Sequence, residues 1–260
     1  MKHQSTLVMF SLMFTLMLTS SNSFADKPLL KTSYYSQNVA PQLFYDDMGR
    51  PTSGILFDIT HAIAKQLDME LEMLPIPRKR IEMSLETNLV DMNCVANPKW
   101  YKSMYIKWSD DLYSNPDILI NREGIKTLDA LSDYKNLRIG TTLGYIYPEI
   151  VGYIKDKNIL PVISTTPSES YEKYRKNKVS GFVSASIEAS YFYKKTEDEV
   201  IHMNDNKIHC ALSPSLSNST INNINTAIHK LKDSGEIEEI LERYKKVPGS
   251  NFQTVQAYSD

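Results

Sequence analysis

The chain has 260 residues and a nearly even charge balance, with 29 Lys and Arg against 31 Asp and Glu. This balance excludes the strongly basic surface that nucleic-acid-binding proteins need, so we expect no nucleic-acid partner. The length exceeds the most common size of a single domain and leaves room for two lobes.

The N-terminal residues have the three parts of a secretory signal peptide. Lys2 precedes an apolar run from Leu7 to Leu18, and Ser23-Phe24-Ala25 forms a small-x-small cleavage site. The apolar run is shorter than the ~20 residues that span a bilayer, so an uncleaved membrane anchor is the less favoured alternative. We therefore predict a signal peptide over 1–25 and a mature chain in the periplasm.

The next part of the chain alternates between strands and helices. The stretch Val39–Leu67 indicates the end of a strand, an acidic turn at Gly49, and an amphipathic helix with Ile59 and Ile63 on its apolar face. The following elements are predicted as strand, helix and buried strand, over Glu70–Pro75, Arg80–Glu86 and Leu89–Ala96. This alternation favours parallel pairing of the strands.

A second block shows the same alternation. Its predicted strands are Asp117–Asn121, Leu137–Thr141, Pro161–Ile163 and Val179–Val183. Its predicted helices are Thr127–Leu131, Pro148–Lys155 and Ser168–Lys176. The chain then continues with a strand over Ile208–Leu212, a helix over Thr220–Lys232 that Gly235 ends, and a last helix marked by Ile237 to Tyr244.

Several short motifs occur in the order found in one known family. They are Val90-Asp91 before an apolar strand, Trp108-Ser109 before Leu112-Tyr113, and Ile139-Gly140 followed by Gly144. Together with the stretch Val39–Leu67, they resemble the bacterial extracellular solute-binding proteins, family 3, which serve amino-acid-type ABC importers. The resemblance extends from about Leu29 to Tyr244.

The resemblance implies an α/β, two-lobed periplasmic-binding-protein fold of type II. Each lobe would be a mainly parallel sheet flanked by helices, and a two-strand hinge would join the lobes. Because chains of this family cross to the second lobe and return, lobe one would comprise 26–113 plus 208–247 and lobe two 118–203. The segment 248–260 has no pattern, and we predict a flexible tail.

Two interpretations stay open for Cys94 and Cys210, the two cysteines of the chain. Both lie in apolar segments that could be neighbouring strands near the hinge, and in an oxidising compartment they could pair. The alternative is two buried free thiols. We favour the free thiols from the sequence.

The resemblance also indicates where the ligand would bind. In family members that bind amino acids, an Arg binds the α-carboxylate and a carboxylate of the second lobe binds the α-ammonium. The matching positions of this chain hold Lys102 and Ser184. Lys lacks the planar fork of Arg, and Ser leaves a buried ammonium without a charged partner. An acidic or carboxylate-bearing ligand is therefore expected.

Two further segments carry candidate anion contacts. Arg78 stands where amino-acid binders usually have an aromatic residue, and it could bind a ligand carboxylate with Arg80 beside it. The alternative is a solvated basic helix start. Gly144-Tyr145 stands where the family has a Gly-Thr whose backbone N–H groups receive the anionic end of the ligand, and an ordinary loop glycine is the alternative.

Aromatic residues near the expected strand ends complete the predicted site. We expect Tyr45 and Trp100 to form walls of the cleft, and Phe44 and Trp108 to belong to the core. The full set of predicted ligand-binding residues is Tyr45, Arg78, Arg80, Asn97, Trp100, Lys102, Gly144, Tyr145 and Ser184.

The sequence thus predicts a binding protein that closes on a small polar ligand, an amino acid or organic acid, and delivers it to the membrane permease of an ABC importer. We expect a monomer with no cofactor, and no metal because the five His show no ligand spacing. No nucleophile elbow or nucleotide loop indicates an enzyme. Two alternatives stay open: a periplasmic sensor subunit for a membrane signalling protein, and a dehydratase-like enzyme with Glu149 as its acid/base residue.

Overall fold

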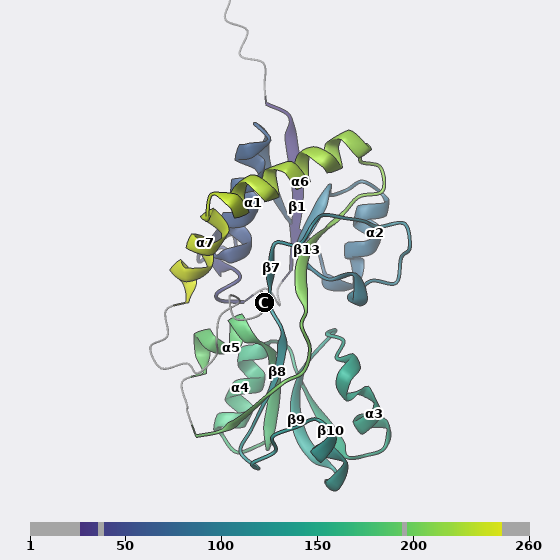
Figure 1. Cartoon of the computed structure of the whole chain (residues 1–260), viewed down its shortest axis with the longest axis vertical. Helices are drawn as coiled ribbons and strands as arrows, with labels where there is room; N and C mark the ends of the chain where they lie inside the picture. Colours follow the sequence, from purple (N-terminus) through teal and green to yellow (C-terminus); the bar gives the residue numbers. More distant parts are fainter. Residues whose placement is uncertain (1–26, 36–38, 194–196, 246–260) are drawn as a thin grey trace, which may run out of the picture.

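The computed structural model describes residues 27–35, 39–193 and 197–245. The predicted signal peptide over 1–25 and the predicted tail over 248–260 lie outside these residues. Figure 1 shows two lobes, one above the other, each with a central sheet and helices on its faces. Within the described part of the chain, none of the helices combines the length and the apolar character needed to cross a membrane.

The sheet of the first lobe has six strands in the order β4-β1-β5-β13-β6, with β7 also paired to β13. Their bounds are β1 Leu29–Tyr34, β4 Glu70–Pro75, β5 Met92–Ala96, β6 Lys107–Trp108, β7 Tyr113–Ser114 and β13 Lys207–Leu212. A separate two-stranded sheet forms from β2 (Phe44–Tyr45) and β3 (Pro51–Ser53). This lobe therefore combines the early part of the chain with a strand from far along it.

Helices cover both faces of this first sheet (Figure 1). On one side lie α1 (Ile55–Gln66), α6 (Asn218–Asp233) and α7 (Glu236–Tyr244), and on the other lies α2 (Ile81–Glu86). α1 buries the apolar positions that its sequence predicts, among them Ile59 and Ile63. Two short 3₁₀ helices follow β4 and β5 respectively: η1 (Arg78–Arg80) and η2 (Pro98–Trp100).

The sheet of the second lobe has five strands in the order β10-β9-β11-β8-β12. Their bounds are β8 Asp117–Asn121, β9 Leu137–Thr142, β10 Ile159–Ser164, β11 Gly181–Ala185 and β12 Glu199–His202. The helices are η3 Asp129–Asp133, η4 Pro148–Ile150, α3 Val151–Lys155, α4 Pro167–Arg175 and α5 Ser186–Phe192. Successive residues of β8 point to opposite faces, so Leu119 joins one core cluster while Ile118 and Ile120 join the other.

Two short segments connect the lobes. The chain passes from β7 to β8 through 115–116 and returns from β12 to β13 through 203–206. The strands that directly follow a crossing segment pair antiparallel with a neighbour: β8 with β11, and β13 with β5. The pairs β1–β4 and β9–β10 are parallel. The strands between the two crossing segments, β8 to β12, form the second sheet, and β13 after the second segment belongs to the first sheet. The lobe boundaries 26–113 plus 208–247 and 118–203 stay predictions.

The predicted fold class is confirmed, and the predicted elements agree closely with the structure. The strands predicted over Glu70–Pro75 and Asp117–Asn121 coincide with β4 and β8. The helix predicted over Thr127–Leu131 is the 3₁₀ helix η3, displaced by two residues. The sequence pattern does not predict α5, whose residues form a short helix without a side-chain cap at its N-terminus.

Cys94 of β5 and Cys210 of β13 form a disulfide across 116 residues of chain. The prediction of two free thiols is therefore wrong, and the alternative that they pair is right. The two cysteines meet because β13 returns from the second lobe and pairs directly with β5. The register of this pair shifts between His209 and Ala211, and Val95 adopts a φ of 60° beside the bridge.

Candidate ligand-binding site

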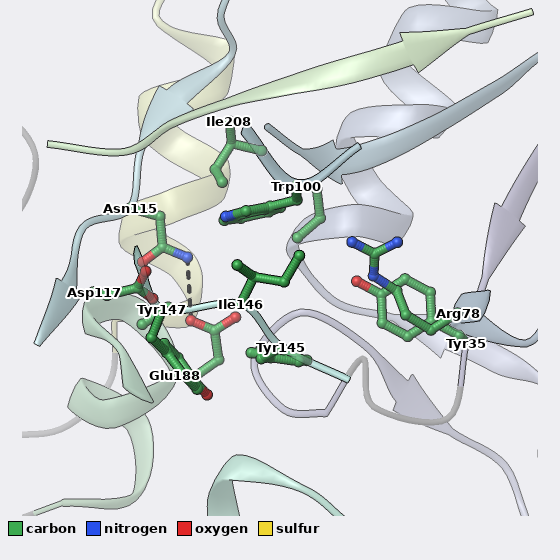
Figure 2. Close-up of a pocket in the computed structure, with 12 residues that line it drawn as sticks. Tyr35, Arg78, Trp100, Asn115, Asp117, Tyr145, Ile146, Tyr147, Glu188 and Ile208 are labelled. Atoms are coloured by element: carbon green, nitrogen blue, oxygen red, sulfur yellow. Dashed lines mark hydrogen bonds between the residues drawn. The ribbon is translucent and has the colours of Figure 1, made fainter. Parts of the chain in front are cut away.

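A cavity lies between the two lobes, beside the crossing segments (Figure 2). It encloses about 490 Å³, including the part open to solvent. The first lobe contributes Tyr35, Arg78, Val95, Trp100 and Ile208. The second lobe and the first crossing segment contribute Asn115, Asp117, Tyr145, Ile146, Tyr147, Ala185 and Glu188. Because both lobes supply walls, rotation about the crossing segments would change the shape of the cavity.

One end of the cavity carries the half-buried guanidinium of Arg78. Arg78 begins η1 directly after Pro77, and its Cζ lies 5.9 Å from the ring centroid of Tyr35 and 5.3 Å from that of Tyr101. Stacking on aromatic rings fixes a guanidinium without using its N–H donors. No carboxylate forms an ion pair with Arg78 in the ranges that the structure describes. Its donors are therefore available to an anion.

Aromatic rings form the walls in the middle of the cavity. Figure 2 shows the rings of Trp100 and Tyr145 on opposite sides, with the side chain of Ile146 between them. Trp100 comes from the first lobe and Tyr145 from the loop after β9 in the second. Burial raises the pKa of Tyr145 well above its ordinary value, so its hydroxyl stays neutral. The two rings and Ile146 form a largely apolar wall, which suits contact with an apolar part of a ligand.

The opposite end of the cavity is acidic. Glu188 of α5 is buried, and its two carboxylate oxygens accept hydrogen bonds from Gln42 Nε2 and Asn115 Nδ2, both at 3.1 Å. Burial raises the pKa of Glu188, while these two hydrogen bonds oppose the rise. Gln42 belongs to the first lobe, so this carboxylate connects the two lobes.

Asp117, the first residue of β8, is the second acidic group at this end. Its Oδ2 accepts hydrogen bonds from Asn204 Nδ2 and Asn206 Nδ2, both at 3.0 Å. Burial raises the pKa of Asp117 to about 7, and the nearby carboxylates of Glu149 and Glu188 add to the rise. The described residues contain no cluster of three or more His, Cys, Asp or Glu that could hold a metal ion.

Three of the nine predicted site residues line this cavity: Arg78, Trp100 and Tyr145. They come from three loops that follow β4, β5 and β9, at the strand ends where ligands bind in α/β proteins. The structure therefore brings together residues from both lobes, although their contact with a ligand stays a prediction.

Two predicted site residues, Asn97 and Ser184, are buried away from the cavity and form hydrogen bonds with the nearby backbone. Asn97 caps η2, because its Oδ1 accepts from the backbone N–H of Lys99 at 2.9 Å and its Nδ2 donates to the carbonyl of Lys207 at 2.8 Å. Ser184 is buried in β11, and its hydroxyl donates to the carbonyl of Ala185 at 3.2 Å. Neither residue is among those that line the cavity.

The remaining predicted residues lie outside the cavity wall. Tyr45 lines a separate hollow with Tyr34 and Pro75. Arg80 and Lys102 are exposed. Gly144 has a φ of 80° in the turn after β9, and a side chain there would meet open space. Exposure fits solvated charges at Arg80 and Lys102, and the positive φ fits a turn glycine at Gly144. Contact of these four residues with a ligand stays a prediction.

The residues that sequence reasoning missed are mainly at the acidic end. Asp117 and Glu188 line the cavity, as do Asn115, Tyr35 and Tyr147. One signal was available, since Asp117 is an acidic residue placed directly before the apolar run Ile118-Leu119-Ile120 at the expected crossing. Glu188 has no comparable signal, because the sequence pattern does not predict its helix α5.

Solved structures of similar fold are two-lobed binding proteins. The ancestral amino-acid-binding protein AncCDT-1, a precursor of cyclohexadienyl dehydratase, superposes with a TM-score of 0.70 at 18% identity, covering 84% of this chain and 95% of that one. An ancestral arginine-binding protein bound to arginine gives 0.67 at 20% identity, covering 84% and 98%. The substrate-binding protein AbpA from Streptococcus pneumoniae, bound to L-arginine, gives 0.65 at 17% identity, covering 86% and 97%.

A search of curated proteins gives no match. The model for bacterial extracellular solute-binding proteins, family 3, matches residues 32–247, which include nearly all of the described chain. The match agrees with the two sheets, the double crossing and the cavity between the lobes. The chain belongs to the bacterial extracellular solute-binding proteins, family 3.

Proposed function

We propose that this chain is a periplasmic binding protein that captures a small, carboxylate-bearing solute and delivers it to the permease of an ABC importer. The cavity between the lobes carries the proposal, because Arg78 presents a guanidinium there that pairs with no carboxylate of the described residues. One structure of similar fold is the substrate-binding protein of an amino acid ABC transporter, which supports the transport role.

The cavity also bears on the rest of the ligand. The sequence alone left a ligand ammonium without a partner, since Ser184 occupies the expected position. In the structure, Asp117 and Glu188 line the end of the cavity away from Arg78 (Figure 2). A ligand with a carboxylate at one end and a cationic or hydrogen-bond-donating group at the other would match both ends. Of the two ligand classes expected from the sequence, an amino acid or an organic acid, this arrangement favours a zwitterion of amino-acid size.

Hinge closure follows from the position of these groups. Arg78 and Trp100 belong to the first lobe, and Tyr145 and Glu188 to the second. A ligand can contact all of them only when the lobes are close together, so it binds the closed state better than an open one. Binding then shifts the population toward closure.

Thermal-shift screening of amino acids, dicarboxylic acids and short peptides tests this proposal. We expect ligands that carry a carboxylate to raise the melting temperature by several degrees, since saturation at 100 times Kd adds about 2.7 kcal/mol to the free energy of unfolding. Arg78→Ala should weaken binding by about 100-fold, through loss of a charged hydrogen-bonding partner. Arg80→Ala is the matched control, because Arg80 is exposed and outside the cavity wall.

Stabilisation by cationic amines alone, or equal binding by wild type and Arg78→Ala, would contradict the carboxylate assignment. The mature protein should be a periplasmic monomer after removal of residues 1–25, which mass measurement and light scattering of the secreted protein check. A permease gene and an ATPase gene beside its own gene would favour transport over the sensor alternative.

We further propose binding without turnover. The dehydratase-like alternative requires Glu149 to reach the ligand, and Glu149 Oε1 instead accepts a hydrogen bond from Asn204 Nδ2 at 3.1 Å. Glu149 is not among the residues that line the cavity. A bound ligand should therefore be recovered unchanged after long incubation. Turnover that Glu149→Gln abolishes would establish the enzyme instead.

A further inference from the structure

The crossing segments meet at one buried carboxylate. Asp117 directly follows the first segment, 115–116, and faces the second, 203–206. Its backbone N–H donates to Asn204 Oδ1 at 3.0 Å, and its carbonyl accepts from the N–H of Met203 at 2.9 Å. The carboxylate itself accepts from the side-chain amides of Asn204 and Asn206. Asp117 therefore joins both paths of the chain between the lobes.

The same residue belongs to the cavity wall. Asp117 lines the acidic end together with Asn115, whose backbone N–H donates to the carbonyl of Asn206 at 2.8 Å. Asn115 also donates to Glu188 through its side chain. A change in the charge of Asp117 thus acts at once on the hinge and on the ligand space.

The surroundings of Asp117 supply hydrogen-bond donors but no compensating charge. Glu149 of η4 and Glu188 of α5 act on it with like charge, and the neutral hydroxyl of Tyr147 lies nearby. On the second path, Asp205 is exposed and so are the flanking His202 and Lys207. No cationic side chain forms an ion pair with Asp117 within the described ranges. The ionised form is therefore held by neutral amides alone.

We propose that Asp117 makes the hinge proton-linked: ionised, it binds the amides of Asn204 and Asn206 firmly, and protonation loosens this connection between the two crossing segments. Hydrogen bonds to an ionised acceptor are roughly twice as strong as those to a neutral one. The inference deepens the proposed function and rests on its hinge closure.

The relevant pH range follows from the burial of this group. The pKa of Asp117 is raised to about 7, so a change from pH 8 to pH 6 converts most of the population from the ionised to the protonated form. A cationic ligand group at the acidic end would favour the ionised form. Its binding near neutral pH would therefore release a proton.

Single-molecule Förster resonance energy transfer (FRET) between dyes on the two lobes tests the proposal without any ligand. Dyes are attached at Lys65→Cys on α1 and Lys155→Cys on α3, two exposed helix positions on different lobes, with the native disulfide intact. We expect the distribution of lobe separations to shift with a midpoint near pH 7. In Asp117→Asn, which keeps the size of the side chain, this shift should be absent.

Asp205→Asn is the matched control, because it removes an exposed carboxylate from the same crossing segment. It should keep the wild-type response. A pH response that survives in Asp117→Asn, or a wild-type protein whose lobe separation is constant from pH 5 to pH 9, would overturn the proposal.

A second measurement covers the case in which Asp117→Asn does not fold. The ¹³C chemical shift of the Asp117 carboxyl in the wild-type protein should titrate with a midpoint near 7. A midpoint near 4, the ordinary value for Asp, would overturn the proposal. Because neither measurement uses a ligand, failure of the solute assignment would leave the hinge response measurable, and the two outcomes are distinct.

Discussion

Buried carboxylates at the acidic end of the cavity are costly side chains for the folded protein. Asp117 and Glu188 are both less than a tenth exposed, and both interact with amide donors rather than cations. Burial raises the pKa of each carboxyl because the charged form loses hydration. Such groups concentrate at functional sites, where their interaction with a ligand offsets this cost.

The titration of Asp117 predicts how stability depends on pH. Its pKa is raised in the folded state, so the folded protein holds a proton that the unfolded chain releases above about pH 4. The contribution of Asp117 to the free energy of unfolding is therefore fully present below pH 4 and is lost as pH rises to about 7. The whole loss is on the order of a few kcal/mol. Urea unfolding of wild type and Asp117→Asn between pH 4 and pH 8 measures it.

The difference between the two proteins isolates this residue from the other carboxylates. We expect Asp117→Asn to lose stability less steeply than wild type as pH rises from 4 to 7. Parallel curves for the two proteins would show that Asp117 titrates at its ordinary value. Above pH 8 both curves should run parallel, since Asp117 is then ionised in the folded and unfolded states.

At the scale of elements, the start of α1 positions part of the site. The backbone carbonyl of Gln42 accepts from the N–H of Leu56 at 3.0 Å and thus caps this helix, while the side chain of Gln42 reaches Glu188. Gly54 at the N-cap has a φ of 124°, and a Cβ there would lie 2.8 Å from the carbonyl carbon of Gln42. Only glycine permits this approach.

Gly54→Ala should therefore lower the free energy of unfolding by about 2 kcal/mol or more, since it adds both a backbone clash and a strained φ. Gly152→Ala in α3 is the matched control, because an added Cβ there meets nothing within 4 Å and the residue is helical. That substitution should be neutral or stabilising by up to about 1 kcal/mol. Denaturant unfolding of both variants distinguishes these outcomes, and equal effects would contradict the close approach.

Elements with clear periodicity are predictable, and α5 shows where this ends. Local patterns predict α1 and β4 from the spacing of their apolar residues, and β8 from its short apolar run, which is buried on both faces. α5 carries Ile187, which packs against the core of the first lobe although the helix belongs to the second. A residue buried by the other lobe leaves no periodic signal within its own helix.

At the scale of the whole molecule, the disulfide secures the return of the chain from the second lobe. Cys210 lies on β13, which occupies an inner position of the first sheet, and Cys94 lies on its neighbour β5. The bridge closes a loop that contains the entire second lobe, which restricts the unfolded chain strongly.

Reduction of this bridge should cost about 2–5 kcal/mol of stability. Calorimetry with and without a reductant measures the loss as a lower melting temperature. The double variant Cys94→Ser with Cys210→Ser should melt at the temperature of the reduced protein and should not respond to the reductant. A wild-type melting temperature that reductant leaves unchanged, with thiol labelling showing complete reduction, would contradict a stabilising role.

The sequence by itself determined the family, most of the strands and helices in their order but not α5 or β12, and Arg78, Trp100 and Tyr145 as candidates, since motifs and periodicity are local properties. Only the tertiary structure decided that Cys94 meets Cys210 and that Asp117 and Glu188 form the acidic end of the cavity. Those contacts join residues brought together by the double crossing between the lobes. Their burial depends on how the two sheets are arranged, which no local pattern encodes.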